Sequence, residues 1–408
     1  GLRPADGGDS PETAGAAKGI QRADGGHLQE LGGDGAMKEY RLSDILDIKH
    51  GFAFDGEYIS SNDNGIVLVT PGNFKIGGGF QEDKCKFFYG EIPKEYILEP
   101  GSFIVTMTDL SKGIDTLGYS AVIPKHRNRV YLHNQRIGLV NFISDECDRG
   151  YIYYLMQTHT YQRSIANSST GSTVHHTSPT RIKEYCFVAP KLSQQRKISK
   201  ILSAYDNLIE NNQEQIKLLE EAAQRLYKEW FVVDGMTKGW RKTNINEILT
   251  FHRGYDLTKV NMEAGPYPVV GATSILGYHR EYKIPGPGIV TGRSGSLGQY
   301  QFIWGNFWPH NTSLYVSDFK GHDIFYIFNL LKTVDFSVLN NGGAIPTLNR
   351  NTLSNIEILE PPSALQAQYG AIAEPFYKKC RVLNLQNQKL TEARDRLLPK
   401  LMSGEIEV

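Results

Sequence analysis

The stretch GSTVHHTSPTRIKEYCFVAPKLSQQ at residues 171–195 recurs in altered form as GGAIPTLNRNTLSNIEILEPPSALQ at residues 342–366. The two stretches align at a constant offset of 171, which places Pro190 over Pro361 and Gln195 over Gln366. An internal repeat of this kind is the sequence signature of a duplicated structural unit. The chain is therefore predicted to consist of two halves that are built alike.

Three further landmarks occur in the same order in both halves. The first of them has helical periodicity and leads into a glycine. They are LSDILDIKHGFAF at 42–54 with INEILTFHRGYDL at 245–257, the β-rich FIVTMTDLSKGIDTLG at 103–118 with GIVTGRSGSLG at 288–298, and the pairs His133-Asn134 and His310-Asn311. The offset falls from 203 at the front to 171 at the back. The first half therefore has the longer variable middle.

One long helix is predicted after each repeated proline. Steps of four and three residues, the spacing of a coiled-coil seam, link Ile198, Leu202, Tyr205, Ile209, Asn212, Ile216, Leu219, Ala223, Leu226 and Trp230. Shifted by 171, the same steps give Tyr369, Ala373, Phe376, Cys380, Leu383, Asn387, Leu390, Arg394, Leu397 and Leu401. A helix of roughly 35 residues is about 50 Å long.

An antiparallel pairing of the two helices, which a pseudo-twofold between the halves requires, brings Asn212 opposite Asn387. A buried asparagine pair sets the register of a coiled coil at some cost in stability. We therefore predict that these two side chains face each other. The alternative is two exposed polar residues that share this spacing by chance.

The length and composition fit several domains. The chain has 408 residues, of which 40% are hydrophobic and 22% charged, enough for more than one core. We expect an α+β protein with two similar globular domains separated by two long antiparallel coiled-coil helices. The predicted segments are a leader at 1–36, domains at 37–190 and 234–362, a central helix at 191–233, and a C-terminal helix at 363–408.

The leader is rich in Gly, Ala and Asp and has almost no large side chains. Such a segment cannot offset the entropy lost on ordering. We interpret residues 1–36 as disordered or artificially added, with the natural start at Met37. A native regulatory tail is the alternative.

Charge and cysteine content narrow the functional classes. The 44 basic side chains balance 44 acidic ones, so any nucleic-acid partner must be bound by local patches. The four cysteines form no CxxC pair, which favours a reducing compartment and no cysteine-based metal site. No apolar run approaches the ~20 residues that span a bilayer. A cytoplasmic protein without a membrane partner is expected.

Signatures of catalysis on nucleotides or DNA are missing from the sequence. GRSGSLG at 292–298 lacks the lysine of a phosphate-binding loop, and we interpret it as a tight turn, with phosphate contact through its backbone amides as the minority alternative. Glu360-Pro361-Pro362-Ser363 fails the amino-methyltransferase tetrapeptide at both ends. His175-His176 has no third ligand nearby and is better explained as a loop pair than as a metal site.

The chain resembles the specificity, or DNA-recognition, subunit of type I restriction-modification systems. The residues that carry the resemblance are the IPTL turn at 345–348, the Pro-Pro-to-Gln passage at 361–366, VAPKLSQQRKI at 188–198, RLYKEWF at 225–231, and the C-terminal LLPKLMSGEIEV. Each motif alone is weak, but their order and duplication are specific. The resemblance covers essentially all of 37–408.

That resemblance implies a non-catalytic subunit that binds double-stranded DNA. Each of its two domains reads one half of a split sequence, and the helices set the spacer between the halves. It docks two methyltransferase subunits and, in the full complex, motor-nuclease subunits. No cofactor is expected in this chain, since S-adenosylmethionine, ATP and Mg belong to those partners.

The candidate DNA contacts are side chains suited to phosphates or base edges. In the first domain they are Lys125, Arg127 and Arg129 for phosphates, with Asn134, Gln135 and Arg136 for bases. In the second domain they are Arg280, Lys283, Arg293, Ser294, His310 and Asn311. The repeated His-Asn pairs have an alternative role in a shared turn, since residues that read different half-sites should differ.

Tyr227, Lys228 and the exposed helix faces are the predicted methyltransferase-docking surface, although charges there also fit a merely solvated face. Two other functional classes stay open. A stand-alone DNA methyltransferase or nuclease would bind S-adenosylmethionine or a metal by itself. A coiled-coil adaptor would not contact DNA. Such an adaptor would have no use for two globular domains whose middle segments differ in sequence.

Overall fold

The computed structural model describes residues 37–111, 113–125, 128–171, 173–233, 237, 239–292, 298–334 and 356–408. The chain divides into two compact units, Gly1–Lys200 with Leu398–Val408, and Ile201–Leu397. We call the strand-rich part of the first unit, residues 37–190, the first lobe. The strand-rich part of the second unit, residues 239–360, is the second lobe. Within the described ranges no helix is long and apolar enough to cross a membrane.

Two small sheets and several short helices build the first lobe. In chain order its elements are β1 (Lys38–Arg41), α1 (Leu42–Ile45), β2 (Leu46–His50), η1 (Gly56–Tyr58), β3 (Ile59–Ser60), β4 (Ile66–Val69), η2 (Pro71–Asn73), β5 (Lys86–Phe88), η3 (Lys94–Tyr96), β6 (Ile97–Leu98), β7 (Phe103–Thr106), β8 (Thr108–Asp109), β9 (Ser120–Val122), β10 (Val130–His133), β11 (Ile137–Phe142), α2 (Arg149–Leu155), α3 (His159–Asn167), β12 (His175–His176), α4 (Pro179–Lys183) and β13 (Cys186–Ala189).

The strand order is β3-β5-β4-β10-β6 in one sheet and β2-β11-β7-β9 in the other, with the separate pairs β1-β13 and β12-β8. Only β4 and β10 pair in parallel among the described ladders of this lobe. Side chains from both sheets share one core: Val67 and Tyr131 from the first meet Ile104, Ala121 and Ile137 from the second. The lobe is therefore a small sheet-on-sheet structure.

The second lobe repeats this plan with fewer strands among its described residues. Its elements are β14 (Arg241–Asn244), α6 (Ile245–Ile248), β15 (Thr250–Arg253), η4 (Lys259–Asn261), β16 (Tyr267–Val270), β17 (Ile275–His279), β18 (Gly288–Gly292), β19 (Tyr300–Ile303), β20 (Trp308–Pro309), β21 (Ser313–Asp318), α7 (Ile324–Thr333) and β22 (Glu357–Glu360).

Every described ladder of the second lobe has a counterpart in the first. The sheet β15-β21-β18-β19 matches β2-β11-β7-β9, the pair β14-β22 matches β1-β13, and β16-β20 is parallel as β4-β10 is. The sheet that contains the parallel pair has three described strands in the second lobe, β17-β16-β20, and five in the first, β3-β5-β4-β10-β6. The duplication predicted from the sequence is confirmed in the fold, and the longer middle of the first half supplies the extra strands.

The helical periodicity at 42–54 and 245–257 gives only one helical turn in each lobe, α1 and α6. The helical periodicity there therefore extends over more residues than the helix itself. After Ile45 the backbone becomes extended, and alternate residues of β2 are buried, Leu46 and Ile48 inward with Asp47 outward. An apolar pattern over so few residues is compatible with a helix or a strand. Pairing with a neighbouring strand decides which of the two forms.

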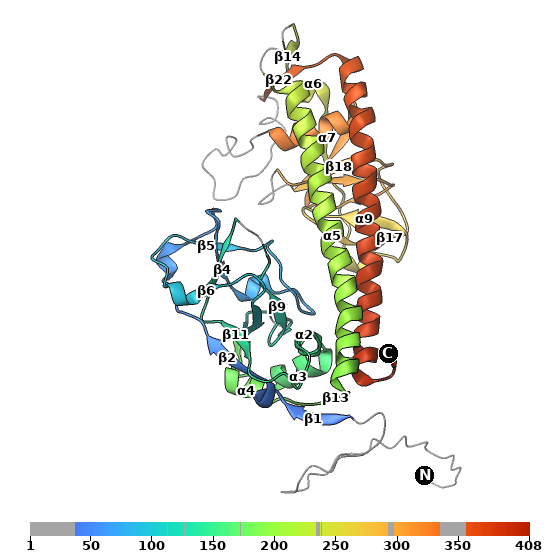
Figure 1. Cartoon of the computed structure of the whole chain (residues 1–408). Coiled ribbons are helices and arrows are strands. Elements are labelled where there is room, and N and C mark those ends of the chain that lie inside the picture. The colour runs from blue at the N-terminus through green and yellow to red at the C-terminus, as the bar shows by residue number, and fades with distance from the viewer. Residues whose placement is uncertain are drawn as a thin grey trace, which may run out of the picture. The chain divides into compact units, whose positions relative to one another are not determined.

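Two long helices follow the lobes, α5 (Leu192–Phe231) and α9 (Ser363–Ser403), of 40 and 41 residues. At 1.5 Å per residue each is about 60 Å long, somewhat more than expected. Within the second unit they pack side by side and antiparallel (Figure 1). Tyr369 Oη donates to the Ala223 carbonyl (3.0 Å) near one end, and Arg394 Nη1 lies 2.6 Å from Asp206 Oδ1 near the other.

The predicted seam is the contact face of these helices. All twenty seam positions are buried or half-buried. At the middle of the seam Asn212 Nδ2 donates to Asn387 Oδ1 at 2.8 Å, so the two side chains face each other. Asn387 Nδ2 also reaches the Ile209 carbonyl at 3.4 Å. Whether this pair sets the register stays a prediction.

Candidate nucleic-acid interface

The predicted DNA-contact residues of the first lobe lie around β10 and its turn into β11. Lys125, Gln135 and Arg136 are exposed, whereas Asn134 is buried. The Asn134 carboxamide oxygen accepts from the backbone N–H of Arg136 at 2.9 Å, which closes the turn. Arg127 lies outside the described residues. Three of these side chains can therefore reach a ligand, and Asn134 has a turn-forming role.

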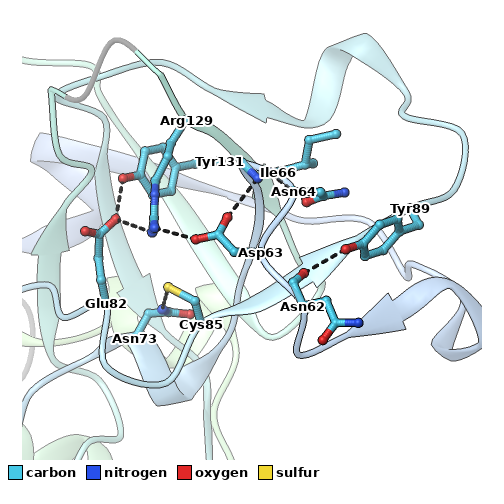
Figure 2. A network of polar contacts seen from close by, with 11 residues as sticks. Asn62, Asp63, Asn64, Ile66, Asn73, Glu82, Cys85, Tyr89, Arg129 and Tyr131 are labelled. Atoms are coloured by element: carbon cyan, nitrogen blue, oxygen red, sulfur yellow. Dashed lines mark hydrogen bonds and ion pairs between the residues drawn. The ribbon is translucent and has the colours of Figure 1, made fainter. Parts of the chain in front are cut away.

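Arg129 is bound by two carboxylates of its own lobe (Figure 2). Its Nη2 lies 2.7 Å from Asp63 Oδ2, and its Nη1 lies 3.1 Å from Glu82 Oε1. The Tyr131 hydroxyl donates to the same Glu82 oxygen at 2.7 Å, and burial together with Glu82 raises the pKa of that hydroxyl. The guanidinium thus ties the start of β10 to two distant loops. A phosphate would have to displace those carboxylates.

The turn after β10 contacts a glycine that has no room for a side chain. A Cβ on Gly51 would lie 2.2 Å from the Asn134 carbonyl oxygen, and one on Gly254 would lie 2.1 Å from the His310 carbonyl oxygen. Phe52 pairs with Asn134, and Tyr255 pairs with His310. The two turns therefore follow the same backbone path.

This correspondence corrects the sequence alignment of the His-Asn pairs by one residue. Asn134 is equivalent to His310, and His133 is equivalent to Pro309, because His133 pairs with Val69 where Pro309 pairs with Val270. The letters His-Asn therefore match without being structurally equivalent. What the lobes share at this turn is the close backbone approach.

Each of these side chains is engaged within its own lobe. His133 Nε2 lies 2.8 Å from the Ile137 carbonyl, and burial lowers the pKa of His133 to about 4, so the ring is neutral near pH 7. His310 contacts the Thr312 hydroxyl (2.9 Å) and the Leu257 carbonyl (3.2 Å). Asn311 Nδ2 donates to Asp256 Oδ1. The alternative role, that of holding a turn, fits this geometry better than base contact.

The remaining second-lobe candidates are only partly described. Arg280 is exposed and forms an ion pair with Glu263 (2.7 Å). Lys283 is exposed, with Nζ 4.7 Å from the centre of the Trp308 ring. Both cations are at the surface and can reach a ligand. Arg293 and Ser294 lie outside the described residues, as does the IPTL turn.

Sequence reasoning missed a buried carboxylate that organises an exposed loop. Asp109 is 2% exposed. It accepts hydrogen bonds from the backbone N–H of Ser111 (2.6 Å), Thr116 (2.5 Å) and Leu117 (3.0 Å) and from the Thr116 hydroxyl (2.7 Å). Burial alone would raise the pKa of Asp109, but these donors outweigh it and lower the pKa. The described residues of the loop 110–117, which exclude residue 112, are thus fixed around an ionised side chain.

This loop exposes Leu110, which is 60% accessible. It comes after the strands β7 and β8. In the sequence repeat β7 aligns with β18, whose last residue, Gly292, begins the sequence GRSGSLG at 292–298. The repeat therefore could have singled out the two sequence segments, 110–117 and 292–298, as a matched pair. Nothing in the sequence around Asp109 announces that its carboxylate is buried.

The His175-His176 pair forms the strand β12, which pairs with β8. His176 Nδ1 lies 3.1 Å from the Thr108 hydroxyl. Across the described part of the chain, no three His, Cys, Asp or Glu side chains gather in a way that could hold a metal ion. The pair therefore lies in a two-stranded ladder and not in the expected loop.

Tyr227 contradicts the predicted docking surface. It is 2% exposed and packs in the second-lobe core, with ring centroids 5.0 Å from Phe231, 5.7 Å from Tyr369 and 5.8 Å from Tyr326. A side chain enclosed in this way cannot contact a partner. Lys228 is exposed and remains a candidate.

Comparison with known proteins gives a family match over most of the chain. The model described as "Type I restriction modification DNA specificity domain" matches residues 35–221 and 237–392. The MjaIX type I restriction enzyme specificity subunit of Methanocaldococcus jannaschii is 26% identical over 303 residues, which is 63% of this chain and 69% of that protein. The EcoprrI specificity subunit of Escherichia coli is 28% identical over 145 residues, 34% of this chain and 36% of that protein.

A solved structure has a similar fold. The S subunit of a type I restriction-modification system from M. genitalium matches with a TM-score of 0.56 and 18% identity, covering 92% of this chain and 98% of that one. At this identity the likeness concerns the fold alone.

Proposed function

Because the chain belongs to the family of type I restriction-modification DNA specificity subunits, we propose that each of its lobes reads one half of a split DNA site. In this proposal the chain is the non-catalytic recognition subunit of the complex, and α5 with α9 sets the length of the unread spacer. The observation that supports it most is the duplication. Two lobes of matching topology each lead into one of two long helices that pack antiparallel.

The DNA contacts in this proposal are the exposed polar groups and the loops of each lobe. In the first lobe they are Lys125, Gln135 and Arg136 with the loop 110–117. In the second lobe they are Arg280 and Lys283, together with Arg293 and Ser294, which carry over from the sequence alone. Since half or more of protein–DNA hydrogen bonds go to the backbone, we expect the cations to position the lobes and the loops to specify the bases.

Salt dependence separates a phosphate contact from a structural cation. Replacing Lys125 with alanine should weaken DNA binding equally for all sequences and lower the salt slope by about one. Replacing Arg129 should leave that slope unchanged, because its charge is already balanced by Asp63 and Glu82. A lower slope for the Arg129 variant would restore it as a phosphate contact.

The exposed faces of the long helices are the proposed docking surface for two methyltransferase subunits. Large apolar side chains are about half exposed there, Leu208 and Leu218 on α5 and Val382 and Leu385 on α9. Lys228 adds a charge on the same helix α5. The partners supply the S-adenosylmethionine chemistry, and motor-nuclease subunits that use ATP and Mg join the full complex. The assembly works in the cytoplasm.

Mapping methylated adenines in cells with and without this chain tests the proposal. The expected result is a motif of two short specified halves separated by a fixed number of unspecified base pairs, which disappears when the chain is removed. A motif that is unchanged by its removal would contradict the proposal. Tight S-adenosylmethionine binding by the purified chain alone would instead indicate a stand-alone methyltransferase.

A further inference from the structure

Each long helix has a fully buried glutamine as its fourth residue. Gln195 in α5 is 0% exposed, and Gln366 in α9 is 1% exposed. These are the two glutamines that the sequence repeat superposes. A buried carboxamide is costly unless its donor and acceptor are both satisfied. Both side chains therefore need specific partners.

The partners are equivalent in the two lobes. Gln195 Nε2 donates to the Pro190 carbonyl (2.8 Å), and Gln366 Nε2 donates to the Pro361 carbonyl (2.9 Å). Gln195 Oε1 accepts from the Asp148 backbone N–H at 2.9 Å. Each glutamine thus crosslinks the end of a lobe to the first turn of the helix that follows it.

The carboxamide oxygen of Gln366 accepts from a side chain, whereas that of Gln195 accepts from a backbone N–H. Gln366 Oε1 lies 3.0 Å from His322 Nδ1. His322 directly precedes Asp323, which caps α7 through the Phe325 and Tyr326 N–H groups. In the first lobe Asp148 is itself the cap of α2. Both glutamines therefore attach to the capped start of the corresponding lobe helix.

Next to each glutamine, the lobe and the long helix pack too closely for a larger side chain. A Cβ on Gly150 of α2 would lie 2.9 Å from Ser199 Cβ of α5. In the second lobe the glycine at this contact belongs to the long helix and not to the lobe. A Cβ on Gly370 of α9 would lie 2.3 Å from Asp323 Oδ2. Ser199 and Gly370 are equivalent at the offset of 171. Both lobe–helix joints are therefore tightly packed around a buried hydrogen-bonded amide.

We propose that Gln195 and Gln366 are positioning residues for spacer-length selectivity, each fixing the angle between its lobe and its helix. The proposal rests on the proposed function of the chain as a two-lobed DNA reader. Its physical basis is that a small rotation at the joint moves the far side of the lobe by a large distance. A loop that contacts DNA lies about 30 Å from the joint, roughly the diameter of a lobe of this size. A rotation of the joint by about 6° therefore moves this loop by about 3.4 Å, the rise of one base pair. A loose joint would therefore accept neighbouring spacers whatever the helix length.

The test uses the complex of the full chain with its methyltransferase subunits. Its substrates carry the two wild-type half-sites with the preferred spacer, or with one base pair more or fewer. The variants are Gln195→Met and Gln366→Met, which keep side-chain volume and remove both hydrogen bonds. The matched controls are Gln194→Met and Gln368→Met, which make the same change at half-buried and exposed neighbours.

For either joint variant, the methylation rate at the preferred spacer relative to its neighbours should fall about tenfold. Discrimination against a wrong base within a half-site should stay unchanged, and both controls should behave as wild type. A merely structural glutamine would lower overall activity or the melting temperature and leave the spacer ratio within twofold of wild type. That outcome would overturn the proposal.

Two features keep the test decisive. If the methionine variants do not assemble, Gln195→Leu and Gln366→Leu replace them, since leucine is uncharged and also lacks the donor and the acceptor of the carboxamide. The same criterion on the spacer ratio applies to them. A wild-type complex that shows no spacer preference would refute the proposed function itself, before any variant is compared.

Discussion

The two lobes share a backbone and differ in the side chains at its tightest turn. In both, a glycine packs against a carbonyl of the turn, Gly51 against Asn134 and Gly254 against His310. The residue before that carbonyl is a buried histidine, His133, in one lobe and Pro309 in the other. The comparison teaches that the duplicated scaffold is kept by backbone contact. Side chains at equivalent positions are then free to diverge, which two lobes that read different half-sites require.

The largest predicted effect tests whether the two turns are equivalent. Gly51→Ala and Gly254→Ala should each lower the free energy of unfolding of their own lobe by about 3 kcal/mol, because the added Cβ meets a backbone carbonyl that cannot move cheaply. Chemical denaturation followed by hydrogen exchange in each lobe measures both values.

The matched controls are Gly56→Ala in the first lobe and Gly305→Ala in the second, where an added Cβ meets nothing within 4 Å. Each should change stability by less than about 0.5 kcal/mol. A large loss at Gly51 with none at Gly254 would break the equivalence of the turns.

A smaller effect separates the lobes by pH. The pKa of His133 is about 4 in the folded chain and about 6.5 when unfolded, so the unfolded state binds the extra proton between these values. Stability should therefore fall as pH drops from 7 to 5, by about 1–2 kcal/mol in the first lobe. Pro309 cannot titrate, so its position adds no such dependence to the second lobe.

His133→Gln supplies the control for that measurement, since glutamine can still donate to the Ile137 carbonyl but has no pKa in this range. The variant should lose this part of the pH dependence when unfolding is measured at pH 7 and pH 5. An equal pH dependence in the variant and the wild type would show that His133 is not its source.

The smallest effect concerns the seam between α5 and α9. Asn212→Leu or Asn387→Leu alone leaves the partner amide without its mate and should cost about 1 kcal/mol, whereas the double variant should raise the melting temperature and loosen register. Thermal unfolding of all four chains gives the coupling. A melting point that is unchanged in the double variant would mean that the pair does not set register.

The sequence predicted the features that depend on local periodicity and on repetition. The seam follows directly from the four-and-three spacing, and the matching lobes follow from the repeat. Features that depend on distant partners were not accessible. Arg129 lies 66 residues from Asp63 and 47 from Glu82, and no local pattern announces that ion pair.

The errors have equally physical causes. Tyr227 is adjacent to the seam stripe and looked exposed, but the second-lobe core extends over that side of α5. The His-Asn pairs were aligned by their letters, whereas the structure aligns the two turns through the glycines. Asp109 resembled any loop aspartate because its burial depends on donors two to eight residues further along the chain.

The central claim, that the paired helices set the spacer, is tested most directly by shortening both of them. Deleting residues 213–219 from α5 and 379–385 from α9 removes one heptad from each. The deletion preserves the Asn212–Asn387 and Asp206–Arg394 contacts and the seam face. The rod should shorten by about 10 Å, so the preferred spacer in a methylation assay should shorten by about three base pairs. An assembled complex that still methylates only the original spacing would contradict the account.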